Sequence, residues 1–341
     1  MKSSLVLFFL LLSVSAVFGQ ADQSTPQFDD YQEMRAYFGK LYQEQKYNEA
    51  ALILEDAIGK YPDHLMANSF NLAIIYRHLD RCQEGCEVLL KALGRGVFFN
   101  KWAFDHDLWN PCKELESFQA VLDGNEKARQ EAQKTAKPDL LVKTPAEYDK
   151  NRQYPLFIAL HGGGGTIAGF KDRWTSGKLE NDYIVAFVQS SQVVSMTGFN
   201  WTEDIEISKR EIAEAFQKVA AEYPIDRKHI IVGGFSSGGV AALEVAFSNT
   251  VPVTGFIALC PARPEGLTAD VVAKAKQAGL CGTILTTEMD PRLDVQKEMV
   301  ELFKTAGFEH RFVITPDIGH WFPEDLNVQI DESIDHINSN S

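Results

Sequence analysis

The pattern of apolar and polar positions divides the chain into two parts. Between residues 28 and 136, apolar residues recur with the three-to-four-residue spacing of helices, and few runs of β-branched residues occur. Helix-breaking residues interrupt this spacing at Pro62, Gly94, Gly96 and Pro111. The pattern predicts an all-α domain over residues 28–136.

Two segments of this first part repeat with an offset of about 35 residues. The first carries Leu41, Ala50, Leu54, Ala57 and Pro62, and the second carries Tyr76, Gly85, Leu89, Ala92 and Val97 at the equivalent positions. The spacing resembles the tetratricopeptide repeat, whose paired helices approach closely at small residues, although the second copy lacks the proline. An unrelated helical bundle is the alternative interpretation.

A stable stack of such repeats needs three or more copies. We therefore expect the two copies to pack against further helices within residues 101–136 or against the second part of the chain. The helical domain would then be either a platform for a protein partner or substrate, or a scaffold that docks on the second part.

Beyond a change of composition at residues 137–154, short apolar runs alternate with helical spacing. The expected strands are residues 156–160, 184–188, 230–232, 255–259, 283–287 and 312–314. The expected helices are residues 205–221, 240–247, 269–277 and 295–306. Several of the strands are continuous apolar runs, which is typical of strands buried on both faces. The second part, residues 140–341, is thus predicted to be an α/β domain with a mostly parallel sheet flanked by helices.

The first nineteen residues are typical of a secretory signal peptide. Lys2 precedes an apolar run at residues 5–12, and small residues follow at positions 13–19. We expect cleavage after Gly19 and a secreted or periplasmic protein. The apolar run is too short for a stable membrane span, and no second run of that length follows.

Five cysteines remain after such a cut, so at least one would be unpaired in an oxidising compartment. Cys82 and Cys86 are one helical turn apart, and either could pair with Cys112. Cys260 and Cys281 fall at opposite edges of the predicted sheet, and we expect both to be buried free thiols. The spacing of the cysteines and histidines indicates no metal site.

Composition excludes some functions and leaves others open. The 341 residues are 45% hydrophobic and 23% charged, which is typical of a packed protein and not of a disordered one. The formal net charge is −14. A field of this sign repels phosphate backbones and anionic lipid surfaces, so we expect no nucleic-acid partner.

A candidate nucleophile lies where the run at residues 229–232 ends. Gly234, Ser236 and Gly238 form a GxSxG motif between a predicted strand and a predicted helix. The turn in this motif is so sharp that the serine adopts a strained backbone conformation, and residues on either side must lack a side chain that would collide. We expect the Ser236 hydroxyl to project beyond the edge of the sheet.

A glycine run follows the first strand of the predicted sheet, at residues 161–165. The N–H groups of Gly163 and Gly162, together with that of Ser237, are candidates for an oxyanion hole. A phosphate-binding loop is the competing interpretation. It would need lysine after Gly169, where Phe170 stands, or an acidic residue after the next strand, where residues 189–191 are Gln-Ser-Ser. We therefore predict no nucleotide and no cofactor.

A serine nucleophile requires a base, and the base requires an acid. His320 directly follows the last predicted strand, and Asp290 follows the strand before it. This order of nucleophile, acid and base is that of α/β-hydrolases. We expect Asp290 to orient the imidazole, Asp294 to cap the next helix and Glu288 to be an exposed loop residue.

Taken in this order, the glycine run, the GFSSGG segment, Asp290 and His320 resemble the α/β-hydrolase superfamily, and in particular its phospholipase/carboxylesterase-like branch. The resemblance covers residues 140–341 and implies a Ser236, Asp290, His320 triad that needs no cofactor. It implies a serine hydrolase that cleaves carboxylic esters of a small-molecule or acylated substrate, and the predicted signal peptide would make this hydrolase a secreted one. A serine peptidase of the same fold, and a secreted interaction protein that uses the helical domain without catalysis, are the alternatives.

Three aromatic residues are candidates for the mouth of the site. Trp321 and Phe322 adjoin His320, and Trp201 follows a loop that is rich in serine, threonine and glycine. An apolar wall of this kind suits an acyl or aromatic group. For Trp201, ordinary core packing is an equally good interpretation.

Overall fold

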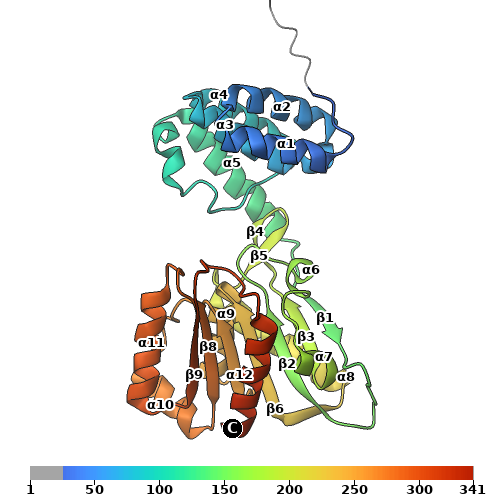
Figure 1. The fold of residues 1–341 in the computed structure, drawn as a ribbon, viewed down its shortest axis with the longest axis vertical. Helices are drawn as coiled ribbons and strands as arrows, with labels where there is room; N and C mark the ends of the chain where they lie inside the picture. Colours follow the sequence, from blue (N-terminus) through green and yellow to red (C-terminus); the bar gives the residue numbers. More distant parts are fainter. Residues whose placement is uncertain (1–25, 341) are drawn as a thin grey trace, which may run out of the picture.

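The computed structural model describes residues 26–340, so the predicted signal peptide lies outside the described residues. Within them, the chain forms an all-helical part followed by a helix-flanked sheet (Figure 1). None of the described helices is both long and apolar enough to cross a bilayer.

The helical part consists of five α-helices and two short 3-10 helices among the described residues. Their bounds are α1 (Tyr31–Gln43), α2 (Tyr47–Lys60), η1 (Pro62–His64), α3 (Leu65–His78), α4 (Cys82–Gly94), η2 (Asp107–Cys112) and α5 (Glu116–Gln133). The equivalent residues Ala57 and Ala92 are buried, and a β-carbon added at Gly85 would lie 3.2 Å from the Ala73 carbonyl oxygen. Small residues thus permit close packing of helices, whereas membership of the tetratricopeptide class stays a prediction.

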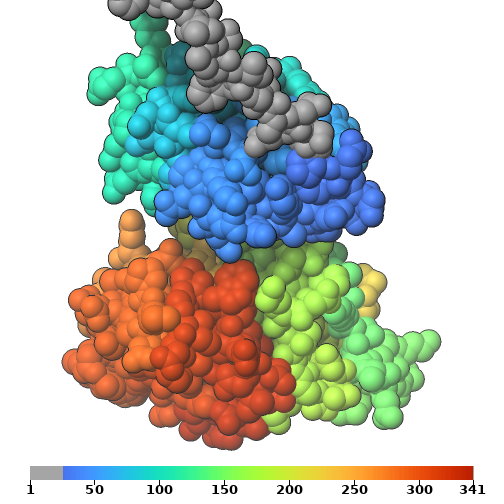
Figure 2. Space-filling model, turned by 45° about the horizontal axis from the view of Figure 1, so that its top comes forward, coloured from blue at the N-terminus to red at the C-terminus, as the bar shows by residue number. Residues whose placement is uncertain are grey.

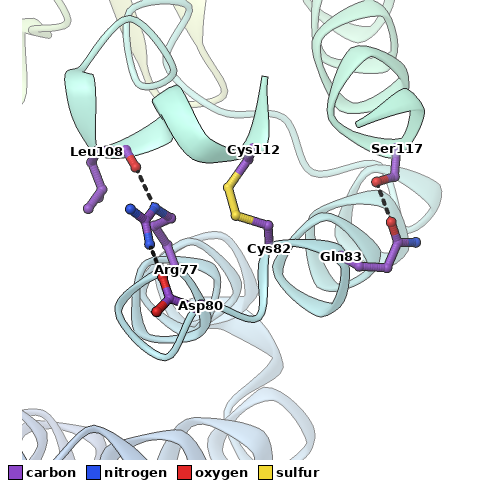
Figure 3. The surroundings of a disulfide bond; sticks show 7 residues. All are labelled: Arg77, Asp80, Cys82, Gln83, Leu108, Cys112 and Ser117. Carbon is purple, nitrogen blue, oxygen red and sulfur yellow. Dashed lines mark hydrogen bonds and ion pairs between the residues drawn. A yellow bond between two sulfur atoms is a disulfide. The ribbon is translucent and has the colours of Figure 1, made fainter. Parts of the chain in front are cut away.

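A disulfide joins Cys82, at the start of α4, to Cys112 in η2 (Figure 3). It is the first of the two pairings that the sequence left open. Beside it, the Arg77 side chain donates a hydrogen bond to the Leu108 carbonyl oxygen at 2.8 Å. The three other cysteines are buried free thiols, as expected for Cys260 and Cys281.

The second part contains a seven-stranded sheet with the strand order β1-β3-β2-β6-β7-β8-β9. The strands are β1 (Asp139–Lys143), β2 (Tyr154–Leu160), β3 (Ile184–Gln189), β6 (Ile225–Phe235), β7 (Gly255–Leu259), β8 (Cys281–Thr287) and β9 (His310–Thr315). All neighbouring strands are parallel except β1, which pairs antiparallel with β3. The six expected strands all exist, and the mostly parallel sheet is confirmed.

Helices cover both faces of this sheet. One face packs on α8 (Ile205–Glu222), α9 (Ser237–Ser248), α10 (Ala269–Gln277) and α11 (Leu293–Ala306). The other face packs on α6 (Ile167–Phe170), α7 (Gly177–Asn181) and α12 (Leu326–Asn340). Successive residues of β2 alternate between the two cores, with Ile158 on the first and Phe157 on the second. Burial on both faces explains why the strands are continuous apolar runs.

A hairpin that the sequence pattern did not predict lies between the two parts. It is formed by β4 (Gln192–Ser195) and β5 (Gly198–Asn200) and begins three residues after β3 ends. The backbone N–H of Lys101 donates to the Val194 carbonyl oxygen at 2.9 Å, and Arg129 of α5 donates to the Val193 carbonyl oxygen at 3.1 Å. The helical part therefore docks on this hairpin (Figure 1).

Because β4 follows the carboxyl end of β3, the carboxyl ends of the parallel strands face the helical part. The space-filling view shows the helical part lying across this end of the α/β part (Figure 2). In open α/β sheets, ligands bind outside the carboxyl ends of the strands. The candidate site thus lies on the side of the sheet that the helical part overhangs.

Candidate active site

Ser236 stands in the turn between β6 and α9 with φ 54° and ψ −115°. A positive φ is strained for any residue with a β-carbon, as expected for this motif. The neighbouring glycines are sterically required: a β-carbon at Gly238 would lie 2.3 Å from the His161 carbonyl oxygen, and one at Gly234 would lie 2.5 Å from the Gly238 carbonyl oxygen. The turn is fixed further by a 2.8 Å bond from the Ser236 N–H to the Leu259 carbonyl oxygen.

The structure brings His320 and Asp290 to Ser236. His320 Nε2 lies 2.9 Å from Ser236 Oγ, and His320 Nδ1 lies 2.8 Å from Asp290 Oδ2. The loops that carry the acid and the base are joined to each other, because the Met289 N–H donates to the Ile318 carbonyl oxygen at 3.0 Å. This geometry is that of a nucleophile, a base and an orienting acid.

The Asp290 side chain is fully buried and accepts two hydrogen bonds. One comes from the Arg292 N–H at 2.7 Å and one from His320, and the buried Cys260 thiol lies close by. Burial alone would raise the pKa of Asp290, but the nearby Cys260 thiol and the bonds from His320 and Arg292 together hold it below its ordinary value. Asp290 is therefore an anion at neutral pH.

Cys260, Asp290 and His320 offer atoms of the metal-ligating type within 4.8 Å of one another. However, burial, followed by the nearby Asp290 carboxylate, raises the pKa of the Cys260 thiol to about 12, so the thiol keeps its proton. The imidazole nitrogen and carboxylate oxygen concerned are also hydrogen-bonded to each other. These residues fit a proton-transfer site better than a cation site.

The predicted oxyanion hole lies beside Ser236. The N–H groups of Gly162 and Gly163 have no acceptor among residues 26–340. Ser237 is the first residue of α9, so its N–H has no intrahelical acceptor. A β-carbon added at Gly163 would lie 3.4 Å from Ser237 Oγ, so these two residues lie side by side. The arrangement leaves N–H groups free for a developing negative charge.

His161 holds the glycine turn in shape. Its Nδ1 lies 2.7 Å from the Gly162 carbonyl oxygen, and its Nε2 accepts a bond from the Ser190 N–H at 3.3 Å. Burial outweighs the Gly162 bond and lowers the pKa of His161 to about 4. The imidazole is thus neutral at neutral pH, and its role is structural.

Trp201 does not line the mouth of the site, so that sequence-based interpretation is wrong and core packing is correct. Its side chain is 0% exposed and belongs to the apolar core beneath the sheet. Its indole N–H donates to the His161 carbonyl oxygen at 2.9 Å, so Trp201 holds the start of the glycine turn from the core side. An apolar body with one polar group suits such a buried position.

The comparison with known families agrees with this geometry. The model of the phospholipase/carboxylesterase family matches residues 146–338, which is more than half of the chain. The chain belongs to the phospholipase/carboxylesterase family. As a family member it is a hydrolase of the esterase type with an α/β-hydrolase fold. No curated protein matches its sequence significantly.

Several solved structures resemble this chain in part or in whole. An uncharacterised protein from Bacillus cereus ATCC 10987 is 24% identical, with a TM-score of 0.51, over 91% of this chain and 99% of its own. The carboxylesterase of Bacillus cereus is 19% identical, with a TM-score of 0.48, over 61% of this chain and 99% of its own. The Est2 esterase of Thermogutta terrifontis, bound to propionate, is 16% identical, with a TM-score of 0.45, over 59% of this chain and 88% of its own. The first likeness spans both the helical and the α/β parts.

Trp321 and Phe322, the two aromatic residues predicted to line the mouth of the site, lie beside the glycine turn in this family member. Trp321 is 53% exposed, and the Phe322 ring packs on Phe235 with 4.4 Å between centroids. Both residues line a cavity of about 280 Å³ together with the glycine turn and Arg173. The Arg173 guanidinium stacks on the Trp321 ring at 5.2 Å. The mouth is therefore aromatic with a cationic side.

The helical part contributes residues that the sequence analysis did not foresee here. The Trp102 ring lies 3.6 Å from where a β-carbon at Gly163 would stand, and Asn100 Nδ2 lies 3.4 Å from where one at Gly164 would stand. Both residues precede η2, in a segment that has no motif. The helical part thus lies against the glycine turn that carries the predicted oxyanion hole.

Arg292 was also missed. Its Nη1 lies 3.2 Å from Ser236 Oγ and 3.3 Å from His320 Nε2. Asp294, the predicted cap of α11, instead lies within its first turn, and Arg292 occupies the capping position without a side-chain cap bond. Glu288 is exposed, as expected. No sequence motif predicts an arginine at this position. The turn that places Asp290 also places Arg292 near the site.

Proposed function

We propose that this chain is an exported serine esterase that hydrolyses carboxylic esters through an acyl-enzyme on Ser236. The observation that carries the proposal is the continuous chain of hydrogen-bond contacts from Ser236 Oγ through His320 to the Asp290 carboxylate, at 2.9 Å and 2.8 Å. A serine hydroxyl is a weak nucleophile until a base accepts its proton.

In the first half of the reaction, His320 Nε2 takes the Ser236 proton as Oγ bonds to the ester carbonyl carbon. The carbonyl oxygen becomes an oxyanion, which the N–H groups of Gly162, Gly163 and Ser237 stabilise. His320 then gives its proton to the leaving alkoxide, and the acyl group remains on Ser236. Asp290 stabilises the imidazolium throughout and stays ionised.

In the second half, water gives a proton to His320 Nε2 as its oxygen bonds to the acyl carbon. The collapse of the second tetrahedral intermediate releases the carboxylic acid, and His320 returns the proton to Ser236 Oγ. Trp321 and Phe322 provide an apolar surface for the acyl or aromatic group.

Export is part of the proposal. The N-terminal sequence has the features of a signal peptide, and the Cys82–Cys112 disulfide suits an oxidising compartment such as a periplasm or the extracellular space. Detection of mature protein that lacks residues 1–19 in the exported fraction supports this assignment, and retention of the intact chain in the cytosol contradicts it.

The kinetic test compares Ser236→Ala with Ser248→Ala, a change at the exposed far end of the same helix. With 4-nitrophenyl acetate, we expect Ser236→Ala to lower kcat by about 10⁶ and Ser248→Ala to leave it unchanged. A matched peptide anilide should be cleaved far more slowly than the ester. Equal activity of the two variants would contradict the acyl-enzyme on Ser236.

A further inference from the structure

The Arg292 side chain points to a preference in substrate that the triad alone does not supply. Its guanidinium can only donate hydrogen bonds, and its partners are the two atoms between which the proton moves, Ser236 Oγ and His320 Nε2. The other residues at the mouth explain aromatic or acyl binding, but none of them explains a cation at the reacting atoms.

Arg292 is half-buried and forms no ion pair with any carboxylate of residues 26–340. The nearest acid in sequence, Asp290, accepts from its backbone N–H and directs the other carboxylate oxygen to His320. A partly desolvated cation without a counter-ion is unfavourable. An anion that reached the site would therefore gain a partner that the protein does not provide.

The position also affects the chemistry. During catalysis His320 becomes a cation, and a second cation 3.3 Å from its Nε2 disfavours that state. An anionic group of the substrate that pairs with Arg292 would cancel this repulsion and draw the guanidinium away from Ser236 Oγ. Neutral esters leave the repulsion in place.

We infer that Arg292 selects esters whose alcohol part carries a carboxylate close to the scissile oxygen. The alcohol part is specified because Nε2, the atom beside Nη1, is the one that returns the proton to the leaving alkoxide. This inference rests on the proposed function and makes Arg292 a specificity-determining residue of the same site. The overall charge of −14 repels anions, so attraction must come from local cations, of which Arg173 lines the neighbouring cavity and Arg292, alone among those the structure describes, contacts the reacting atoms.

The test uses 3-acetoxybenzoate and its methyl ester, which share an acetyl group and differ in the charge on the alcohol part. For each enzyme we take kcat/KM for the charged ester and divide it by kcat/KM for the neutral ester. Dividing the result by the same ratio for hydroxide-catalysed hydrolysis removes the difference in intrinsic reactivity between the two esters. We expect Arg292→Gln to lower this ratio by about tenfold to a hundredfold, the range for a hydrogen bond to a charged group. Arg227→Gln, at the opposite, amino-terminal end of β6 and exposed, should keep the wild-type ratio.

A second variant and an inhibition measurement guard against misfolding. Arg292→Met keeps the length of the apolar stem and should give the same change as Arg292→Gln. In the wild-type enzyme, 3-hydroxybenzoate should inhibit at lower concentration than its methyl ester does. The inference would be overturned if both variants kept the wild-type ratio, as they would if kcat/KM fell equally for the charged and the neutral ester. It would also be overturned if 3-hydroxybenzoate and its methyl ester inhibited the wild-type enzyme equally.

These results are distinguishable from failure of the proposed function. If the wild-type enzyme hydrolyses neither ester and does not react with a fluorophosphonate, the esterase proposal itself falls and the inference falls with it. If it hydrolyses the methyl ester but Arg292→Gln leaves the ratio unchanged, only the role of Arg292 is wrong. If it reacts with the fluorophosphonate and hydrolyses neither ester, the assignment of the substrate class is wrong.

Discussion

Replacing Asp290 by asparagine keeps the size of the side chain and removes its charge. In the structure one carboxylate oxygen accepts from His320 Nδ1 and the other accepts from the Arg292 N–H. An amide has only one acceptor oxygen. Whichever way the new amide turns, its NH₂ group meets a donor.

If the NH₂ group faces His320, the imidazole must accept at Nδ1 and therefore carries its proton on Nε2. That tautomer points a proton at Ser236 and cannot act as the base. The loss for a triad trapped in this state is about 10⁴ in kcat, which corresponds to about 5.4 kcal/mol at 1.36 kcal/mol for each factor of ten. If the NH₂ group faces Arg292, it replaces the carboxylate oxygen that lies 2.7 Å from the Arg292 backbone nitrogen. Two N–H donors cannot remain this close, so the loop must shift.

The assay is steady-state hydrolysis of 4-nitrophenyl acetate, with Glu288→Gln as the matched control. Glu288 is an exposed carboxylate two residues away, and its neutralisation should change kcat by less than about twofold because it touches no member of the triad. A kcat for Asp290→Asn within tenfold of wild type, in a variant that is folded at the assay temperature, would refute the role assigned to Asp290.

Three further predictions concern stability. Gly238→Ala puts a β-carbon 2.3 Å from a backbone oxygen and should lower the free energy of unfolding by more than about 4 kcal/mol. Gly266→Ala is the control: the added β-carbon meets open space, so the free energy of unfolding should change by less than about 0.5 kcal/mol. Similar melting curves for the two variants would contradict this prediction. Replacing Cys82 and Cys112 by serine opens a loop with a sequence separation of 30 and should cost about 3.6 kcal/mol by loop entropy, measured by denaturant unfolding; unchanged stability would show that the disulfide does not form. The lowered pKa of Asp290 means that its ionised form stabilises the fold above the unfolded pKa, and that this contribution is lost as pH falls through the folded value. The difference in unfolding free energy between wild type and Asp290→Asn should therefore be constant from pH 7 to about 5 and shrink below that; a constant difference down to pH 2 would contradict it.

The sheet and most of its helices could be predicted because their residues are buried on both faces. Residues 156–160 and 255–259 are continuous apolar runs, and such runs leave few alternatives to a central strand. By contrast, β1 is partly exposed at the edge of the sheet and its sequence, DLLVK, is short and mixed. The strands of the β4–β5 hairpin are only four and three residues long, and the position of the hairpin depends on contacts with α5 that only the folded chain brings together.

The residues at the candidate site could be predicted where a sequence motif, or a position directly after a strand, indicates where the side chain lies. Ser236, Asp290 and His320 each follow a strand, and parallel strands bring those ends to one edge. Trp201 was ambiguous because an aromatic residue near a site has no local signal that separates inward from outward orientation. Arg292 carries no signal at all, since its side chain reaches Ser236 across 56 residues of sequence.

The central claim is that Ser236 is the nucleophile of this fold. The most direct measurement is labelling of the purified mature protein with a fluorophosphonate, followed by mass spectrometry of its peptides. A single adduct on Ser236, lost on acid unfolding of the protein before labelling, is the expected result. An adduct on another residue, or no adduct in folded protein at neutral pH, would contradict the account.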